Sequence, residues 1–329
     1  MEQTQLLQRR IQERRAKEDP PGDVRLVPCD ACGSMQLLSV LEKASSRGEV
    51  YQVSRCRDCS LVQVNPQPDL ARVEPYYADE YFERRTDRGY ANYYSENIKQ
   101  EIRRVYNLNL NDLDFFDYER QLFGESWLVE SLSGDPKLGR KHTPVALDVG
   151  CAAGYFVEYL RDRNWEARGV ELSRKAAHFG LFELELDIIV GDFLNCNRLE
   201  AESYDLITLW ASIEHMHSPR RVLEQAHHLL KPGGRMLLST CRYGWLARMR
   251  GARWRYMNVP EHLYFFSLAG LKGLARQVGL QTVCSVTYGS GMTTRPDAGP
   301  LYRVAKRLAD PLVKLTNQGD MMALHLIKA

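Results

Sequence analysis

Four cysteines near the N-terminus form two matched pairs. Cys29 and Cys32 stand in CDACG, Cys56 and Cys59 stand in CRDCS, and residues 33–55 separate the two pairs. Two residues between the thiolates of each pair allow both sulfur atoms to bind one metal ion, and four thiolates complete the tetrahedral shell of zinc. Because such a shell leaves no position open for water, we expect a structural Zn2+ in a zinc ribbon. The alternative, two unrelated buried cysteine pairs, leaves the repeated spacing unexplained.

A second candidate site lies near the middle of the chain, in the stretch LDVGCAAG at residues 147–154. A glycine pair directly after a short apolar run predicts a strand that turns into a helix, with the backbone of Gly150 and Gly154 left bare for the approach of a ligand. The spacing is GxxxG, whereas the dinucleotide fingerprint GxGxxG carries a further glycine against the pyrophosphate. The pattern therefore favours a ligand without a pyrophosphate over NAD.

The elements that must position these residues alternate in type from Val145 onward. Short apolar runs such as VALDVG, DIIVGDF and YDLITLW alternate with helical patterns, which predicts an α/β fold with a mostly parallel, doubly wound sheet. Ser218 and Ser267 begin helices, and QTVCSVTY and MMALHLIKA are expected to supply two closing strands. Ligands of such sheets bind outside the carboxyl ends of the strands, which places the GxxxG loop at the site.

The chain divides into four expected regions. They are an N-terminal charged helix or disordered arm at 1–24, the zinc ribbon at 25–66, a helical, tyrosine-rich cap segment at 67–140, and the main domain at 141–329. Within the ribbon, two strands are expected to join around SSRGE. Within the cap segment, the spacing of Ile98, Ile102, Val105 and Leu108 predicts a helix packed on the main domain, with tyrosine hydroxyls facing a cleft.

Five motifs of the main domain occur in a fixed order: LDVGCAAG, GVELS, GDF, SIEHMHSP and LKPGG. Together they resemble the class I S-adenosylmethionine-dependent methyltransferases over residues 145–280, near the branch that includes ubiquinone-pathway and sugar-modifying enzymes. PEHLYFFS is similar to a late motif of that branch. The resemblance implies a Rossmann-like, seven-stranded sheet, S-adenosyl-L-methionine as cofactor and methyl transfer as the reaction.

The residues of these motifs suit that cofactor. Glu171 can accept hydrogen bonds from both ribose hydroxyls, Asp192 from the adenine amino group, and Phe193 can offer a ring edge or its backbone N–H. Asp148 can orient the ammonium, and Trp210 is expected to wall the sulfonium or, alternatively, to be a core indole. The full candidate set is Asp148, Gly150, Cys151, Gly154, Glu171, Leu172, Asp192, Phe193 and Trp210.

Methyl transfer to a hydroxyl needs a base near the acceptor, and histidine suits that role near neutral pH. His215 follows the fourth strand and His262 stands in PEHLYFFS, so each is a candidate base, with a structural hydrogen-bonding role as the alternative. Relatives that bind a divalent ion here carry ExxEH, whereas this chain has Ala211 at the first acidic position. We therefore expect no catalytic magnesium and expect Glu214 to orient a neighbour or bind substrate.

An arginine-rich lid is expected over residues 242–262. The segment holds five arginines before Pro260 without an acidic residue, which suits a phosphate or carboxylate on the acceptor, with a solvated lid face as the alternative. The later stretch LYRVAKRLADPLVKL predicts a basic amphipathic helix that packs on the sheet edge or on a second subunit, which would make a homodimer.

The expected function is O-methylation of a small molecule, such as a sugar, a nucleotide sugar or a secondary metabolite. An RNA methyltransferase and a non-catalytic cofactor-binding scaffold are the alternatives. The net charge of +2 does not favour a nucleic acid partner. No run approaches the roughly 18 apolar residues of a membrane span, and the charged N-terminus is unlike a signal peptide, so we expect a cytoplasmic protein without a membrane partner.

Overall fold

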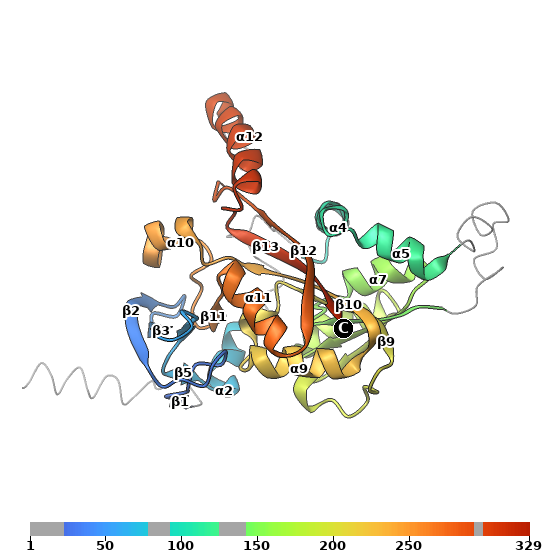
Figure 1. Ribbon diagram of the computed structural model, residues 1–329, viewed down its shortest axis with the longest axis horizontal. Helices are drawn as coiled ribbons and strands as arrows, with labels where there is room; N and C mark the ends of the chain where they lie inside the picture. The colour runs from blue at the N-terminus through green and yellow to red at the C-terminus, as the bar shows by residue number, and fades with distance from the viewer. Residues whose placement is uncertain (1–22, 78–92, 125–142, 293–298) are drawn as a thin grey trace, which may run out of the picture.

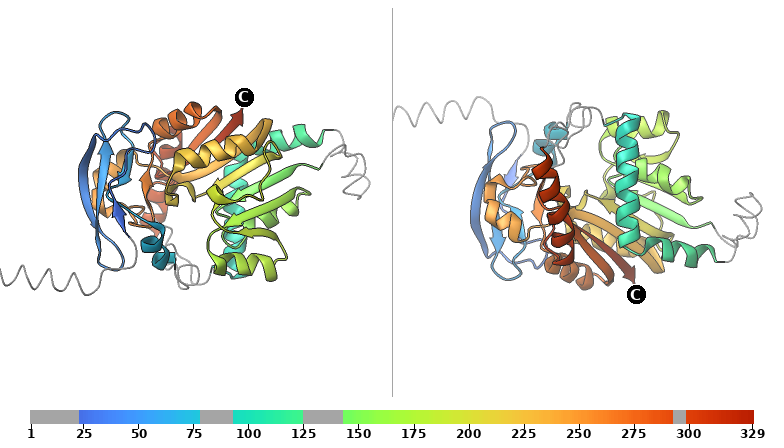
Figure 2. Two further views of the ribbon diagram at one scale, coloured as in Figure 1. Left: turned by 90° about the horizontal axis from the view of Figure 1, so that it is seen from below. Right: turned by 90° about the horizontal axis from the view of Figure 1, so that it is seen from above.

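A computed structural model describes residues 23–77, 93–124, 143–292 and 299–329. The expected N-terminal arm lies outside the described residues except for its last two positions. Parts of the cap segment, including Tyr81 and Tyr90, also lie outside them. The described chain contains a large central sheet with helices on both faces and a smaller sheet, the zinc ribbon, at one end of the molecule (Figure 1, Figure 2).

The central sheet has seven strands in the order β12-β13-β10-β9-β6-β7-β8. The strands β6 to β10 run parallel, and β13 is antiparallel to both of its neighbours. This arrangement confirms the predicted doubly wound sheet and its two closing strands. The strands are β6 (Val145–Val149), β7 (Glu166–Glu171), β8 (Asp187–Val190), β9 (Tyr204–Trp210), β10 (Leu230–Cys241), β12 (Leu280–Tyr288) and β13 (Met321–Lys328).

Successive residues of the central strands face opposite layers of helices. Leu206 and Leu237 belong to the apolar core beneath α4, α5 and α7, whereas Ile207 and Leu238 belong to the core beneath α9 and α11. This alternation follows from the two-residue period of a strand. The helices are α2 (Leu70–Val73), α4 (Glu96–Asp112), α5 (Phe115–Phe123), α7 (Tyr155–Arg161), α8 (Arg174–Phe182), α9 (Pro219–Leu229), α10 (Trp245–Arg250), α11 (Leu268–Gln277) and α12 (Pro300–Leu315).

The helix predicted in the cap segment exists as α4, but its buried stripe differs from the expected one. Val105 and Leu108 are exposed, at 47% and 59%. The side that faces the body carries Tyr106, whose ring contacts Phe156, and continues to the buried Leu110. Ile102 and Ile98, four and eight residues before Tyr106, are half-buried on that side. The predicted stripe is therefore right at Ile98 and Ile102 and wrong at Val105 and Leu108.

The ribbon sheet contains β2 (Leu37–Ala44), β3 (Val50–Cys56) and β4 (Val62–Val64), and the turn between β2 and β3 is the expected one. Its fourth strand is β11 (Tyr264–Phe265), which comes from the region assigned to the main domain. A second small sheet pairs β1 (Val24–Arg25) with β5 (Gln67–Pro68). The ribbon is therefore joined to the main domain by strand pairing as well as by sequence.

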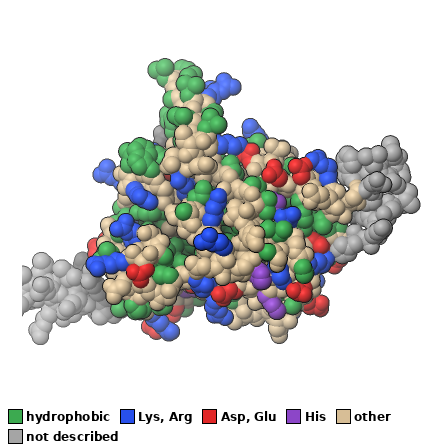
Figure 3. All heavy atoms as spheres, viewed as in Figure 1, with side chains coloured by type: hydrophobic (Ala, Val, Ile, Leu, Met, Phe, Trp, Pro, Cys, Tyr) green, Lys and Arg blue, Asp and Glu red, His purple; other side chains and the backbone are tan. Residues whose placement is uncertain are grey.

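The amphipathic helix α12 stands away from the body (Figure 1). No residue of it is buried, and its apolar stripe of Leu301, Val304, Leu308, Leu312 and Leu315 faces solvent, as the protruding hydrophobic column in Figure 3 shows. The prediction that this helix packs on the sheet edge is therefore wrong. Its packing on a second subunit remains a prediction. None of the helices in the described part of the chain is long and apolar enough to cross a bilayer.

Candidate functional site

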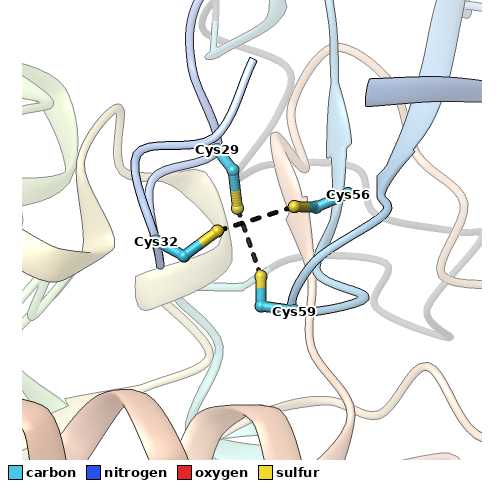
Figure 4. A group of neighbouring side chains, drawn as sticks. All are labelled: Cys29, Cys32, Cys56 and Cys59. Atoms are coloured by element: carbon cyan, nitrogen blue, oxygen red, sulfur yellow. Dashed lines mark hydrogen bonds between the residues drawn. The ribbon is translucent and has the colours of Figure 1, made fainter. Parts of the chain in front are cut away.

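The four ribbon cysteines converge on one point (Figure 4). The Cys29 and Cys59 sulfur atoms lie 3.3 Å apart, and those of Cys32 and Cys56 lie 3.6 Å apart. Zinc–sulfur bonds of about 2.3 Å in a tetrahedron place sulfur atoms about 3.8 Å apart, close to these separations and far beyond a disulfide bond of about 2.05 Å. The four side chains therefore fit a tetrahedral zinc ion.

We expect the purified protein to contain one zinc per chain by inductively coupled plasma mass spectrometry. Replacing Cys56 with serine should reduce this to below about 0.2 zinc per chain, because a hydroxyl is a poor substitute for the fourth thiolate. The control is Cys196→Ser, a half-buried cysteine far along the chain, which should retain one zinc. Full zinc content in Cys56→Ser would contradict the site.

The loop after β6 adopts the turn that the glycine pair predicts. Gly150 and Gly154 have φ of +72° and +78°, in the left-handed region that favours glycine. A Cβ atom at Gly150 would lie 2.7 Å from Cβ of Ser212, and one at Gly154 would lie 2.6 Å from Cδ1 of Leu186. Both glycines are thus required by close protein packing. Gly154 is buried and Gly150 and Ala152 are half-buried, so the backbone that a ligand could reach lies at Gly150 and Ala152.

Glu171 ends β7 beside this loop and is nearly buried. Its Oε2 accepts a hydrogen bond of 2.7 Å from the Ala152 amide, and its Oε1 accepts one of 2.7 Å from the Ser173 amide. Burial raises the pKa of Glu171, and these amides oppose the shift. Each carboxylate oxygen has a second lone pair, so the held carboxylate can still accept both ribose hydroxyls. Leu172 beside it is 47% exposed, as a side chain that packs on adenine would be.

Asp148 lies at 3% exposure within β6, and its Oδ1 accepts a 2.6 Å hydrogen bond from Thr208 Oγ1. Burial raises the pKa of Asp148 to about 7, the hydrogen bond from Thr208 opposes the shift, and the negative charge of Glu171 adds to it. A cationic ligand would favour the ionised carboxylate. If Asp148 contacts the ammonium of the cofactor as predicted, its charge state would couple cofactor binding to pH.

Binding of S-adenosylhomocysteine, the demethylated product of the cofactor, should strengthen as pH rises from 5.5 to 7. Below pH 7 the free protein holds a proton on Asp148, and the ligand ammonium must displace it, so the affinity should change by up to about tenfold per pH unit. Isothermal titration calorimetry in two buffers of different ionisation enthalpy should detect the released proton. Asp148→Asn should flatten the profile, and an equally steep profile in that variant would contradict the assignment.

The remaining cofactor candidates differ in what they can contribute. Asp192 is exposed, but its oxygens accept from the Leu194 amide at 3.2 Å and from Asn195 Nδ2 at 2.5 Å, so adenine would share it with this turn, η3 (Phe193–Asn195). Phe193 is buried in the apolar core at 4% exposure, and its contact with the base, by ring edge or by backbone N–H, stays a prediction. The Cys151 side chain is also buried, with burial raising its thiol pKa.

Trp210 ends β9 and is half-buried, and its contact with the sulfonium stays a prediction. Its ring packs against Tyr106 and Phe156, with centroids 5.4 Å and 5.1 Å away, as a core indole would. Its Nε1 is buried and has no hydrogen-bond partner among the described residues. A buried indole N–H without a partner is costly, so a ligand oxygen at this position would be stabilised.

The three candidate catalytic residues come together as one group, the histidine cluster of Glu214, His215 and His262. Their ligating atoms all lie within 4.8 Å of one another, and the two imidazole centroids are 4.6 Å apart. Glu214 Oε2 accepts from Thr240 Oγ1 at 2.8 Å, and both Glu214 and His262 are buried, at 2% and 1% exposure. Residues from the turn η4 (Ile213–His215) and from the PEHLYFFS motif thus form a single site.

Two contacts orient the His215 ring. Its Nδ1 lies 2.7 Å from the Glu261 carbonyl oxygen and 2.9 Å from the hydroxyl of Tyr77, which belongs to η1 (Glu74–Tyr77). A carbonyl oxygen only accepts, so this contact keeps a proton on Nδ1 and leaves Nε2 as the basic nitrogen of the neutral ring. The sequence had indicated tyrosine hydroxyls facing a cleft, but it did not single out Tyr77.

A carboxylate and two imidazoles are also a donor set that suits a divalent transition metal better than magnesium. The donor set therefore agrees with the expectation, based on Ala211, that no catalytic magnesium binds here. His262 lies beside Glu214 and His215, so the cluster offers two imidazoles and one carboxylate. The expectation about magnesium remains a prediction, and the zinc measurement above would also detect a second metal.

The lid differs in detail from the expected arginine surface. Arg248, Arg250 and Arg253 are exposed on α10 and η5 (Gly251–Arg253). Trp254 instead is buried at 2% exposure, and its Nε1 donates to Asp320 Oδ1 at 3.1 Å, an acidic partner supplied from just before β13. Only Trp245, at 60% exposure, remains as an aromatic contact on the lid surface.

The comparisons with known proteins agree with the motifs. The family model described as "Methyltransferase domain" matches residues 128–285. "Ubiquinone biosynthesis O-methyltransferase" of Ralstonia nicotianae is 29% identical over 147 residues, 41% of this chain and 62% of that protein. The protein of the same name from Paraburkholderia phymatum is 30% identical over 159 residues, 43% of this chain and 67% of that protein.

Among solved structures, an S-adenosylmethionine-dependent methyltransferase from Mesorhizobium loti is similar with a TM-score of 0.43 and 14% identity. The match covers 62% of this chain and 98% of that one. The alignment with the Ralstonia protein covers less than two thirds of that protein's length. The family model matches residues 128–285, so its match does not include the predicted zinc ribbon.

Proposed function

This chain belongs to the S-adenosylmethionine-dependent methyltransferases, and on that premise we propose that it methylates an oxygen atom of a small molecule. The observation that carries the proposal is the histidine cluster at the carboxyl ends of β9 and β10, on the same edge of the sheet as the GxxxG loop. A methyl donor and a base for a hydroxyl would meet at that edge.

In this proposal Glu171, Asp148 and the backbone of the loop hold the cofactor, which supplies the activated methyl group. His215 would accept the proton of the acceptor's hydroxyl at Nε2, which would leave the oxygen as the nucleophile for the methyl group that the sulfonium releases. Its ring is oriented by the Glu261 carbonyl and by Tyr77. Glu214 and His262 lie against His215, where their polar groups favour the imidazolium that forms.

The acceptor is proposed to be a sugar, a nucleotide sugar or a secondary metabolite with a negative charge. The relatives named as O-methyltransferases support oxygen as the acceptor atom. The exposed guanidinium groups of Arg248, Arg250 and Arg253 support an anionic group, because an arginine fork pairs well with phosphate and carboxylate. A structural zinc ion in the four-cysteine site completes the proposed set of ligands.

Transfer of a radiolabelled methyl group tests this proposal. The full chain is incubated with labelled S-adenosylmethionine and, separately, with a panel of nucleotide sugars and phenolic metabolites and with structured RNA. We expect label in the small-molecule fraction. Label in RNA alone would favour the RNA methyltransferase, and product binding without any transfer would favour the non-catalytic scaffold.

A further inference from the structure

We propose that the zinc ribbon positions the catalytic loop, and that Asp30 in its first knuckle is the residue through which it does so. The proposal rests on the proposed function of His215. Asp30 lies between Cys29 and Cys32, but its side chain contacts the main domain. There it meets Ser218 and Arg220, which follow His215 in the chain.

Asp30 caps α9 from outside the helix. Ser218 stands at the N-cap position but makes no side-chain capping bond of its own. Instead, Ser218 Oγ donates to Asp30 Oδ1 at 2.7 Å, and the Arg220 amide donates to Asp30 Oδ2 at 2.7 Å. A carboxylate at a helix N-terminus satisfies an otherwise unpaired amide and interacts favourably with the helix dipole. The ribbon thereby holds the start of α9, three residues after His215.

Backbone atoms of the first knuckle contribute to the same contact. Arg220 Nε donates to the Asp30 carbonyl oxygen at 3.1 Å, and the same guanidinium donates to the Ala31 carbonyl oxygen. These carbonyl groups belong to the turn between Cys29 and Cys32, whose shape depends on the thiolates meeting one metal ion. The geometry of the zinc turn is thus transmitted to α9.

The ribbon also holds the second catalytic segment. The Val64 amide donates to the Leu263 carbonyl oxygen at 2.8 Å, and β4 pairs with β11 directly after His262. Tyr77, which follows the ribbon, contacts both His215 Nδ1 and the Glu261 carbonyl oxygen, the latter at 3.2 Å. Both loops of the histidine cluster are therefore anchored on the ribbon side. The GxxxG loop is held by β7, where the Gly150 amide donates to the Val170 carbonyl oxygen, and it meets the segment before His215 at Ser212.

Asp30 contacts the main domain at Ser218 and Arg220, on the side of the histidine cluster and away from the proposed cofactor site. Asp30→Ala should leave zinc content and the affinity for S-adenosylhomocysteine within about twofold of the wild type, because Glu171 and the GxxxG loop are untouched. Methyl transfer should fall by about 10- to 100-fold, since a displacement of the order of 1 Å at a catalytic group has that effect. The Cε1–H resonance of His215, assigned by its loss in His215→Asn, should shift.

Two matched variants separate positioning from general destabilisation. Asp30→Asn keeps an acceptor for the Arg220 amide, and its Nδ2 can donate to Ser218 Oγ, so it should restore activity and the His215 resonance to near wild type. Asp58→Ala removes an exposed acid from the second knuckle and should change nothing. Hydrogen exchange of peptides over 212–220 should quicken in Asp30→Ala alone, with peptides over 147–160 unchanged.

An unshifted His215 resonance and unchanged exchange over 212–220 in Asp30→Ala would overturn the proposal. If Asp30→Ala does not fold, Ser218→Ala carries the test, because it removes the hydroxyl that donates to Asp30 Oδ1 and leaves the contacts of His215 itself in place. An unshifted His215 resonance in that variant would then overturn it. A shifted resonance in a protein that methylates no acceptor would sink the proposed function while leaving the positioning role intact.

Discussion

Glu171→Ala should abolish cofactor binding at ordinary ligand concentrations, with the dissociation constant of S-adenosylhomocysteine rising by about 100- to 1,000-fold. The variant removes the carboxylate proposed to accept both ribose hydroxyls and also frees the Ala152 amide of the glycine loop. Hydrogen bonds to a charged group contribute about 1.5–3 kcal/mol each, and 1.4 kcal/mol is tenfold in affinity. Isothermal titration calorimetry on the full chain measures the change.

Glu166→Ala is the matched control for that experiment. Glu166 begins the strand that Glu171 ends, and its side chain is exposed. Its removal should leave affinity within about twofold, because surface substitutions away from special features rarely exceed about 0.5 kcal/mol. An affinity within threefold of the wild type in Glu171→Ala would contradict the proposed cofactor site. The proposed function would then fail too, because it depends on cofactor binding at Glu171.

His215→Asn should lower kcat by about 100- to 10,000-fold, the usual contribution of a positioned base, and leave product affinity unchanged. Asparagine retains an N–H that can donate to the Glu261 carbonyl oxygen but has no basic nitrogen at the Nε2 position. The loss should therefore come from chemistry rather than from a displaced loop. Initial rates with the acceptor found in the label screen, together with calorimetry, separate these effects.

Two further variants decide between the candidate bases. His228→Asn replaces an exposed histidine on α9 and should retain full activity. His262→Asn should have a smaller effect than His215→Asn if His262 supports the cluster, because it is buried against Cys241 and His215. Wild-type kcat in His215→Asn would exclude this residue as the base, and a larger loss in His262→Asn would assign the role to His262.

Local spacing in the sequence was enough to identify several parts of this protein. The four cysteines that the structure brings together follow from two CxxC units, because two intervening residues let both thiolates of a pair reach one tetrahedral ion. The turn at Gly150 follows from its glycine, and the order of strands and helices follows from apolar periods of 2 and 3.6 residues. Each of these features is set by neighbours within a few residues along the chain.

The contacts that orient the proposed base join residues that are far apart in the sequence, so local spacing did not predict them. Tyr77 and His215 are 138 residues apart in the sequence, and Asp30 and Ser218 are 188 apart. The two-residue strand β11 is too short to be predicted from a period, and although it lies in PEHLYFFS, nothing local predicts that it pairs with the ribbon. The exposed Val105 and Leu108 show the same difficulty, because a helix pattern does not state which of its stripes will find a partner.

By itself, the sequence determined the family, the candidate ligand sets and most of the elements that the chain forms, since ligand spacing and periodicity are properties of short segments. Only the tertiary structure decided that the ribbon lies against the histidine loop and that His215, His262 and Glu214 share one site. The physical reason is that strand order and the packing of buried faces bring together residues that are far apart in the sequence. No local pattern around such residues predicts that they will be in contact.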